Sequence, residues 1–85
     1  MSENLVNLIR EFGDNFAIQD DSILINDIKY YFTRKNDTNI YNGIFKGYHK
    51  LGYVIFHNVY IYNGNGFQHY INCLSSPYID KIYYL

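Results

Sequence analysis

The residues of this chain best suited to chemistry are three histidines and one cysteine. His57 and His69 lie on consecutive predicted strands joined by Asn-Gly-Asn-Gly, so the two imidazoles could face each other across a hairpin. Two imidazoles do not complete a tetrahedral zinc site, and the chain has no Cys-x-x-Cys or His-x-x-x-His spacing to supply further ligands. Both histidines are therefore predicted to be ordinary cross-strand or surface residues.

The remaining candidates for catalysis or metal binding are equally weak. Cys73 lies on an extended segment roughly 13 Å from His69, which is too far for a nucleophile–base pair. The carboxylates of Asp20, Asp21 and Asp27 could bind a divalent cation. A solvent-exposed turn, in which aspartate is common, explains these residues more simply. The Asn-Gly-Asn-Gly segment precedes a strand, so no helix N-terminus completes a phosphate-binding loop. The sequence predicts no enzyme, no metal and no cofactor.

The element that precedes these residues is predicted to be a helix over residues 1–13. Its apolar residues recur at helical spacing, at Leu5, Leu8, Ile9 and Phe12. Ser2 is placed to cap this helix, and Gly13 is placed to end it.

After residue 13 the hydrophobic period becomes two, which is typical of strands. Residues 14–27 are expected to form a connecting hairpin, in which 16–19 pair with 22–26. Five strands are then predicted, at 27–34, 39–49, 53–62, 66–72 and 78–85. One helix and five closely connected strands describe a single, mainly β domain over residues 1–85, with a small, strongly bent barrel over 28–85.

Two glycines lie four residues apart on the second predicted strand, at Gly43 and Gly47. A strand in a small barrel bends sharply, and glycine marks such a bend or a close approach of another backbone. We therefore predict that both positions are bends, and that Gly52 opens the turn into the next strand.

Composition points toward an association surface. The chain has eleven tyrosines and six phenylalanines but no tryptophan. Tyrosine buries a large ring while its hydroxyl stays wet, which suits strands and interfaces. The net charge of −1 argues against a strong general affinity for nucleic acid, although residues 28–72 hold five Lys and Arg against one acid. The fold either gathers that charge on one face or spreads it over a mixed surface.

Targeting signals are not recognisable in this sequence. A lone cysteine allows no internal disulfide, the N-terminus lacks a basic start and apolar core, and no apolar run would cross a bilayer. The expectation is a soluble, cytoplasmic protein with no membrane partner.

Residues 43–59, GIFKGYHKLGYVIFHNV, resemble the first motif of the Sm/LSm family, which includes bacterial Hfq. That motif runs Gly-x-Leu-x-Gly-aromatic-Asp-x-aromatic-Met-Asn-Leu-Val-Leu-x-Asn-Val. The positions that match in type are Gly43, Phe45, Gly47, Tyr48, Val54, Ile55, Phe56, Asn58 and Val59. Residues 74–79, LSSPYI, are similar to the second motif, Ile-Arg-Gly-x-x-Ile, at Leu74 and Ile79. The resemblance implies an N-terminal helix followed by a five-stranded, strongly bent Sm-like (SH3-like) barrel.

The same resemblance implies non-catalytic binding of RNA, or of another single-stranded nucleic acid, through loop residues. The site residues that it implies here are His49, Lys50, Tyr53, Ser75, Ser76 and Tyr78. His49 and Lys50 would meet phosphate, while Tyr53 either stacks on a base or serves as a ring of the barrel or interface.

Several of these residues depart from the family pattern. His49 replaces an aspartate, Leu51 a base-stacking aromatic, and Tyr53 an asparagine that contacts the base, while Ser75 and Ser76 replace an Arg-Gly pair. The alternative is therefore a protein-interaction module, such as a viral or mobile-element accessory protein, that keeps the barrel and has lost the nucleic-acid pocket.

The last predicted strand suggests how the chain assembles. It is rich in β-forming residues and carries no charged tail, and such edges normally pair with a partner strand. The Sm resemblance implies a homo-oligomeric ring, in which the fourth strand of one subunit pairs with the fifth of its neighbour. The expected interface residues are Phe67, His69, Tyr70, Ile71, Ile82, Tyr83 and Tyr84.

Overall fold

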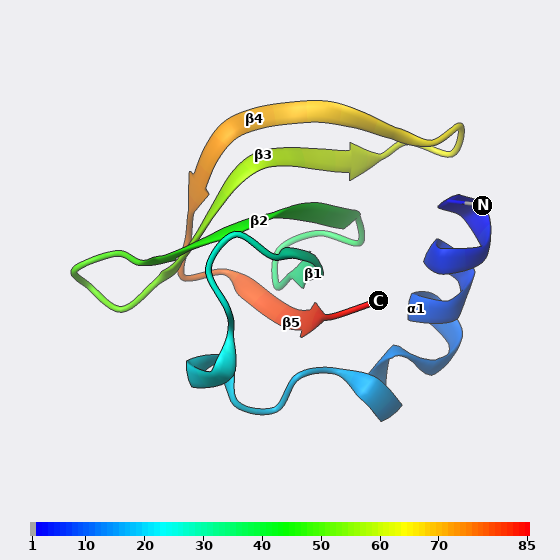
Figure 1. Ribbon diagram of the computed structural model, residues 1–85. Coiled ribbons are helices and arrows are strands. Elements are labelled where there is room, and N and C mark those ends of the chain that lie inside the picture. The colour runs from blue at the N-terminus through cyan, green and yellow to red at the C-terminus, as the bar shows by residue number, and fades with distance from the viewer. Residues whose placement is uncertain (1) are drawn as a thin grey trace.

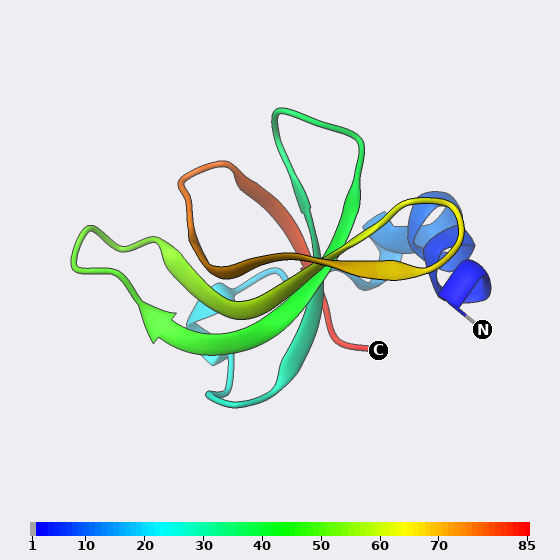
Figure 2. The ribbon, with the colours of Figure 1, turned by 90° about the horizontal axis from the view of Figure 1, so that it is seen from above.

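The computed structural model describes residues 2–85, except for the side chains of Ser2, Glu3 and Asp21. The elements are the helix α1 (Ser2–Phe16), the short 3-10 helix η1 (Asp21–Ile23) and the strands β1 (Lys29–Arg34), β2 (Ile40–Tyr48), β3 (Val54–Tyr62), β4 (Phe67–Ser75) and β5 (Ile79–Tyr83). Figures 1 and 2 show one bent sheet with α1 at one end. Neither helix in this part of the chain has the length and apolarity needed to span a membrane.

The five strands form one antiparallel sheet in the order β4-β3-β2-β1-β5. The predicted fold class, a helix followed by five strongly bent strands, is confirmed. The sheet is open, because β4 and β5 lie at its two ends and do not pair with each other. The strand bounds agree with the prediction to within a few residues, although β4 runs on to Ser75 and β5 stops at Tyr83.

Helix α1 packs through a narrower face than its apolar pattern predicts. Val6 and Ile9 are buried, whereas Leu8 and Phe12 remain 40% and 52% exposed. The Ser2 cap concerns a side chain that lies outside the described ones.

The predicted helix end at Gly13 is wrong, because α1 continues to Phe16. Gly13 is buried against the last strand, where an added Cβ would lie 2.9 Å from the Tyr83 hydroxyl oxygen. The residue is therefore explained by the close approach of helix and strand. The extra turn also brings the Phe16 ring to 5.5 Å from that of Tyr83.

The predicted hairpin over residues 14–27 is also wrong, since this segment holds the end of α1, the helix η1 and no strand. Its local bonding favours a turn: the backbone nitrogen and Oγ of Ser22 donate to Asp20 Oδ1 at 3.0 and 2.7 Å. These hydrogen bonds lower the pKa of Asp20. The segment instead lies along β5, where Ile18 N donates to Ile82 O at 2.7 Å.

Hydrophobic clusters cover both faces of the sheet near β1, whose side chains alternate between them. On the inner face, the Phe32 ring stacks on those of Phe56 and Tyr41, with centroids at 4.3 and 5.3 Å. On the other face, Tyr31 and Tyr83 pack with the buried residues of α1. The core therefore draws on β1, β2, β3 and β5.

The bends predicted at Gly43 and Gly47 are confirmed. The pairing of β2 with β3 shifts register between Asn42 and Ile44 and again between Phe45 and Tyr48. At Gly43 an added Cβ would lie 3.0 Å from the Phe56 Cβ, so the two strands touch there. Gly47 has φ +101°, which glycine adopts readily, and Gly52 with φ +93° lies in the predicted turn.

Candidate functional site

The loop between β2 and β3 is held by its own hydrogen bonds. His49 N donates to Tyr53 O, and Gly52 N donates to His49 O, both at 2.7 Å. Leu51 N donates to His49 Nδ1 at 3.1 Å. The rings of His49 and Tyr53 stack with centroids 5.8 Å apart and planes at 16°. The loop therefore presents the stacked rings of His49 and Tyr53 together with Lys50, which is exposed.

The second group of predicted site residues lies between β4 and β5. Ser76 is only 7% exposed, and its Oγ accepts a hydrogen bond from Tyr78 N at 3.0 Å. Tyr78 is 53% exposed, while Ser75 ends β4 at the surface. The hydroxyl of Ser76 thus shapes the turn into β5.

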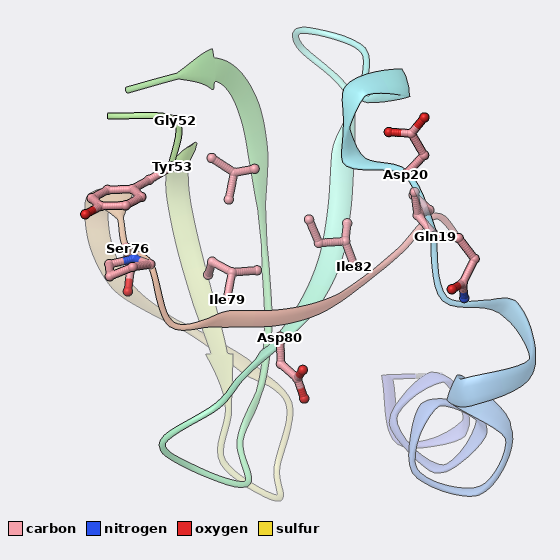
Figure 3. A pocket seen from close by; sticks show the side chains of 11 residues that line it. Gln19, Asp20, Gly52, Tyr53, Ser76, Ile79, Asp80 and Ile82 are labelled. Carbon is pink, nitrogen blue, oxygen red and sulfur yellow. The ribbon is translucent and has the colours of Figure 1, made fainter. Parts of the chain in front are cut away.

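Tyr53 and Ser76 meet in a pocket of about 350 Å³. Figure 3 shows these two residues on one side, Gln19 and Asp20 on the other, and Ile79 and Ile82 between them. The other four predicted nucleic-acid residues, His49, Lys50, Ser75 and Tyr78, do not line this pocket. Of the six predicted residues, two therefore line this pocket, while His49 contacts Tyr53 and Tyr78 contacts Ser76.

The charge of this pocket does not suit phosphate. Its lining includes the carboxylates of Asp20 and Asp80 and contains no Lys, Arg or His. A phosphate there would be repelled by two like charges and would meet no cation. The neighbouring β2–β3 loop does carry a cation, Lys50.

The residues predicted to form an oligomer interface fall into two unlike sets. On β4, Tyr70 and Ile71 are 47% and 41% exposed, His69 is exposed, and Phe67 is half-buried with its ring centroid 5.7 Å from that of Tyr31.

On the β5 side, the structure places two of the predicted interface side chains inside the chain's own core. Ile82 and Tyr83 are 5% and 3% exposed, because β5 is covered on both faces. Tyr84, beyond the end of the strand, is 65% exposed. Of these three residues, only Tyr84 offers its side chain to a neighbour.

The two strand histidines do not face each other. His69 pairs with Tyr60, because the hairpin closes with Tyr62 opposite Phe67, and His57 pairs with Cys73 beyond a one-residue register shift between Val59 and Tyr60. Within residues 2–85, excluding the undescribed side chains, no three His, Cys, Asp or Glu residues gather as metal ligands would.

A larger pocket of about 470 Å³ lies on the sheet itself and was not anticipated from the sequence. It is lined by Lys29, Tyr31, Asn42, Gly43, Ile44, Asn58, Tyr60 and Phe67. These residues come from four strands, so only the strand register brings them together. We call it the sheet pocket.

Comparisons of this chain with models of protein families, with curated proteins and with solved structures find no match. The resemblance of residues 43–59 to the Sm motif therefore stays a prediction.

Proposed function

We propose that this protein is a non-enzymatic, Sm-like module that self-associates by strand pairing at the outer edge of β4. The observation that supports this proposal is the exposure of that strand. β4 is nine residues long and ends the sheet, and residues 68–73 are all exposed. An edge this long and open is a template for another strand.

The sequence of β4 lacks the usual protections of a free edge. Residues 67–75, FQHYINCLS, contain no Lys, Arg, Asp, Glu or Pro, which are the residues that normally discourage edge pairing. Tyr70 and Ile71 add exposed apolar surface. A second copy of the chain would satisfy the outward backbone groups and cover these side chains together.

Two arrangements of the copies are consistent with this proposal. A β4–β4 pair gives a closed dimer, while a β4–β5 contact gives the ring that the Sm resemblance implies. The ring requires Ile18 to release Ile82 O, since that bond occupies the outer edge of β5. Copy number therefore distinguishes the two arrangements.

The test is size-exclusion chromatography with light scattering at micromolar concentration. We expect an oligomer for the unmodified chain and a monomer for Ile71→Lys, because a lysine on an edge strand opposes pairing. Leu51→Lys is the matched control, since Leu51 is also an exposed apolar residue but lies away from β4. A monomeric unmodified chain, or equal loss of association in both variants, would contradict the proposal.

A second function, binding of RNA or another single-stranded nucleic acid, is favoured by the His49–Tyr53 stack beside Lys50. Aromatic faces stack on bases, and a cation attracts the backbone. Fluorescence anisotropy with oligo-U and oligo-A should then show salt-sensitive binding that Tyr53→Ala and Lys50→Ala both weaken. Absence of binding at low salt would leave the protein-interaction module as the function.

A further inference from the structure

We propose that the sheet pocket binds a nucleotide unit, with the base among its aromatic and amide side chains and the phosphate on Lys29. This inference does not depend on self-association. It also concerns a different place from the β2–β3 loop, because no residue of that loop lines the sheet pocket.

The size of the pocket suits a small ligand. Its volume of about 470 Å³ lies within the range of roughly 300–1,000 Å³ that is typical of small-molecule sites. Tyr31, which is only 6% exposed, contributes to its wall. The Phe67 ring packs against Tyr31 and Tyr62 with centroids 5.7 and 5.5 Å away. This wall is therefore held in place before any ligand arrives.

Tyr60, on β3, adds a further aromatic ring to the lining of the pocket. Its ring meets that of His69 edge-on, at 5.5 Å and 86°, and the residue is 37% exposed. Because Tyr60 lines the pocket and is partly exposed, its ring is accessible for stacking, and base–aromatic stacking contributes about 1–3 kcal/mol per base.

Two asparagines give the pocket hydrogen-bonding groups that match a base edge. Asn42 is 7% exposed although polar, and Asn58 has φ +51° at the point where the pairing of β2 with β3 shifts register. Left-handed conformations of residues other than glycine recur at ligand sites, where the surrounding structure maintains them. A carboxamide both donates and accepts, so it can pair with the adjacent donor and acceptor of adenine.

The charge of the sheet pocket complements an anion. Lys29 lines it, with Nζ 5.6 Å from the Tyr31 ring centroid, and none of the lining residues is a carboxylate. The pocket beside Tyr53 has the opposite character, with two carboxylates and no cation. Rings, amides and one cation together select a planar base that carries phosphate.

Calorimetric titration of the full chain with AMP, adenosine and oligo-A tests this proposal. We expect AMP to bind saturably and Tyr60→Leu, which preserves apolar bulk, to weaken it at least about fivefold. Lys29→Ala should weaken the binding of AMP about tenfold and leave the binding of adenosine unchanged, because adenosine has no phosphate. Lys35→Ala and Tyr84→Leu are the controls and should leave AMP binding unchanged, because both residues are exposed and lie outside the sheet pocket and the β2–β3 loop. Circular dichroism verifies the fold of each variant.

The oligo-A arm identifies the source of the nucleotide. Tighter binding of oligo-A than AMP, still sensitive to Tyr60→Leu, indicates a nucleic-acid strand, whereas equal binding indicates a free nucleotide. The proposal is overturned if neither AMP nor oligo-A saturates the protein, or if folded Lys29→Ala and Tyr60→Leu bind as the unmodified chain does. Loss of binding only in the Lys50 and Tyr53 variants would also overturn it and assign the ligand to the loop. Light scattering on the same samples reports self-association separately.

Discussion

The two ends of the sheet, β5 and β4, contain similar residues but have opposite surroundings. Both strands combine tyrosine and isoleucine with polar residues. On β5, Ile82 and Tyr83 are buried, and Ile18 bonds to the outer edge. On β4, residues 68–73 are exposed. Figure 1 shows the cause: the segment that follows α1 runs along the β5 side, while β4 arches over the opposite end of the sheet.

This difference shows that composition alone does not separate a core strand from an interaction strand. What separates them is coverage by α1 and residues 17–28, which pack against β1 and β5. The β5 end should therefore carry much of the stability of the domain, and the β4 end should contribute less to stability than to association.

The largest expected effect compares one tyrosine from each end. Tyr83→Ala removes a buried ring beneath α1, and we expect the free energy of unfolding to fall by about 3–5 kcal/mol. Tyr70→Ala removes a ring that is 47% exposed and contacts Tyr41 at 5.7 Å, so we expect a loss of about 1 kcal/mol. Urea unfolding of both variants measures the two losses. Equal losses of stability in the two variants would contradict the proposed difference between the two ends of the sheet.

A smaller effect is expected midway across the sheet, at the bends of β2. Gly43→Ala places a methyl group 3.0 Å from the Phe56 Cβ and 3.3 Å from the Val59 Cγ2, so we expect a loss of about 1–3 kcal/mol in urea unfolding. Gly52→Ala meets no atom within 4 Å, and its cost of about 1–2 kcal/mol arises from the positive φ alone. Gly52→Asn separates the two causes, because asparagine tolerates positive φ and should recover part of the loss at this position. Full stability of Gly43→Ala would show that the strands do not touch there.

The next effect concerns alkaline pH. Burial raises the pKa of Tyr41 and of Tyr83, and the Asp37 carboxylate, which accepts from Tyr41 Oη at 2.6 Å, adds to the rise for Tyr41. The folded state therefore holds these protons more tightly than the unfolded state. Their contribution is fully present below about pH 10, the ordinary tyrosine value, and is lost as the pH rises through the folded-state pKa values.

Urea unfolding between about pH 8 and pH 11, a range that spans the ordinary tyrosine pKa, measures this loss of stability. Tyr41→Phe should lower stability by about 1 kcal/mol at neutral pH, because the hydrogen bond to Asp37 is removed. It should also make the alkaline decline shallower, since one of the shifted hydroxyls is gone. An unchanged slope would contradict the role assigned to burial at this residue.

The smallest effect is expected for the ion pair that joins α1 to β5, between Lys81 and Asp14. The Lys81 and Asp14 side chains are 41% and 81% exposed, so solvent screens their attraction. Lys81→Ala should leave the unfolding midpoint nearly unchanged. A large loss would mean that the β5 end depends on charge and not on the burial of Tyr83.

Local patterns were sufficient to predict most of the fold. Alternating apolar residues located the five strands, and the glycines at 43, 47 and 52 marked bends and a turn, because strand period and positive φ are properties of short segments. Gly13 was misread because its cause is distant: the residue that requires a glycine there is Tyr83, in the last strand. The hairpin over 14–27 failed because its first arm is used elsewhere: α1 continues to Phe16, and Ile18 N donates to Ile82 O.

The candidate sites depended on register, which the sequence does not display. Tyr53 and Ser76 line one pocket, but the carboxylates of Asp20 and Asp80 beside them became visible only in three dimensions. The sheet pocket draws on four strands whose shifts at Asn42 and Val59 set which side chains meet. The burial of Ile82 and Tyr83 likewise follows from where α1 and residues 17–28 pack.

Hydrogen–deuterium exchange as a function of protein concentration tests the central claim, that β4 is the associating edge, most directly. We predict that backbone amides in residues 67–75 gain protection as the concentration rises through the association range. Amides of Ile79–Tyr83 stay equally protected in a β4–β4 dimer and gain protection in a β4–β5 ring. Protection of β4 that does not change with concentration, or a gain confined to another element, would contradict the account.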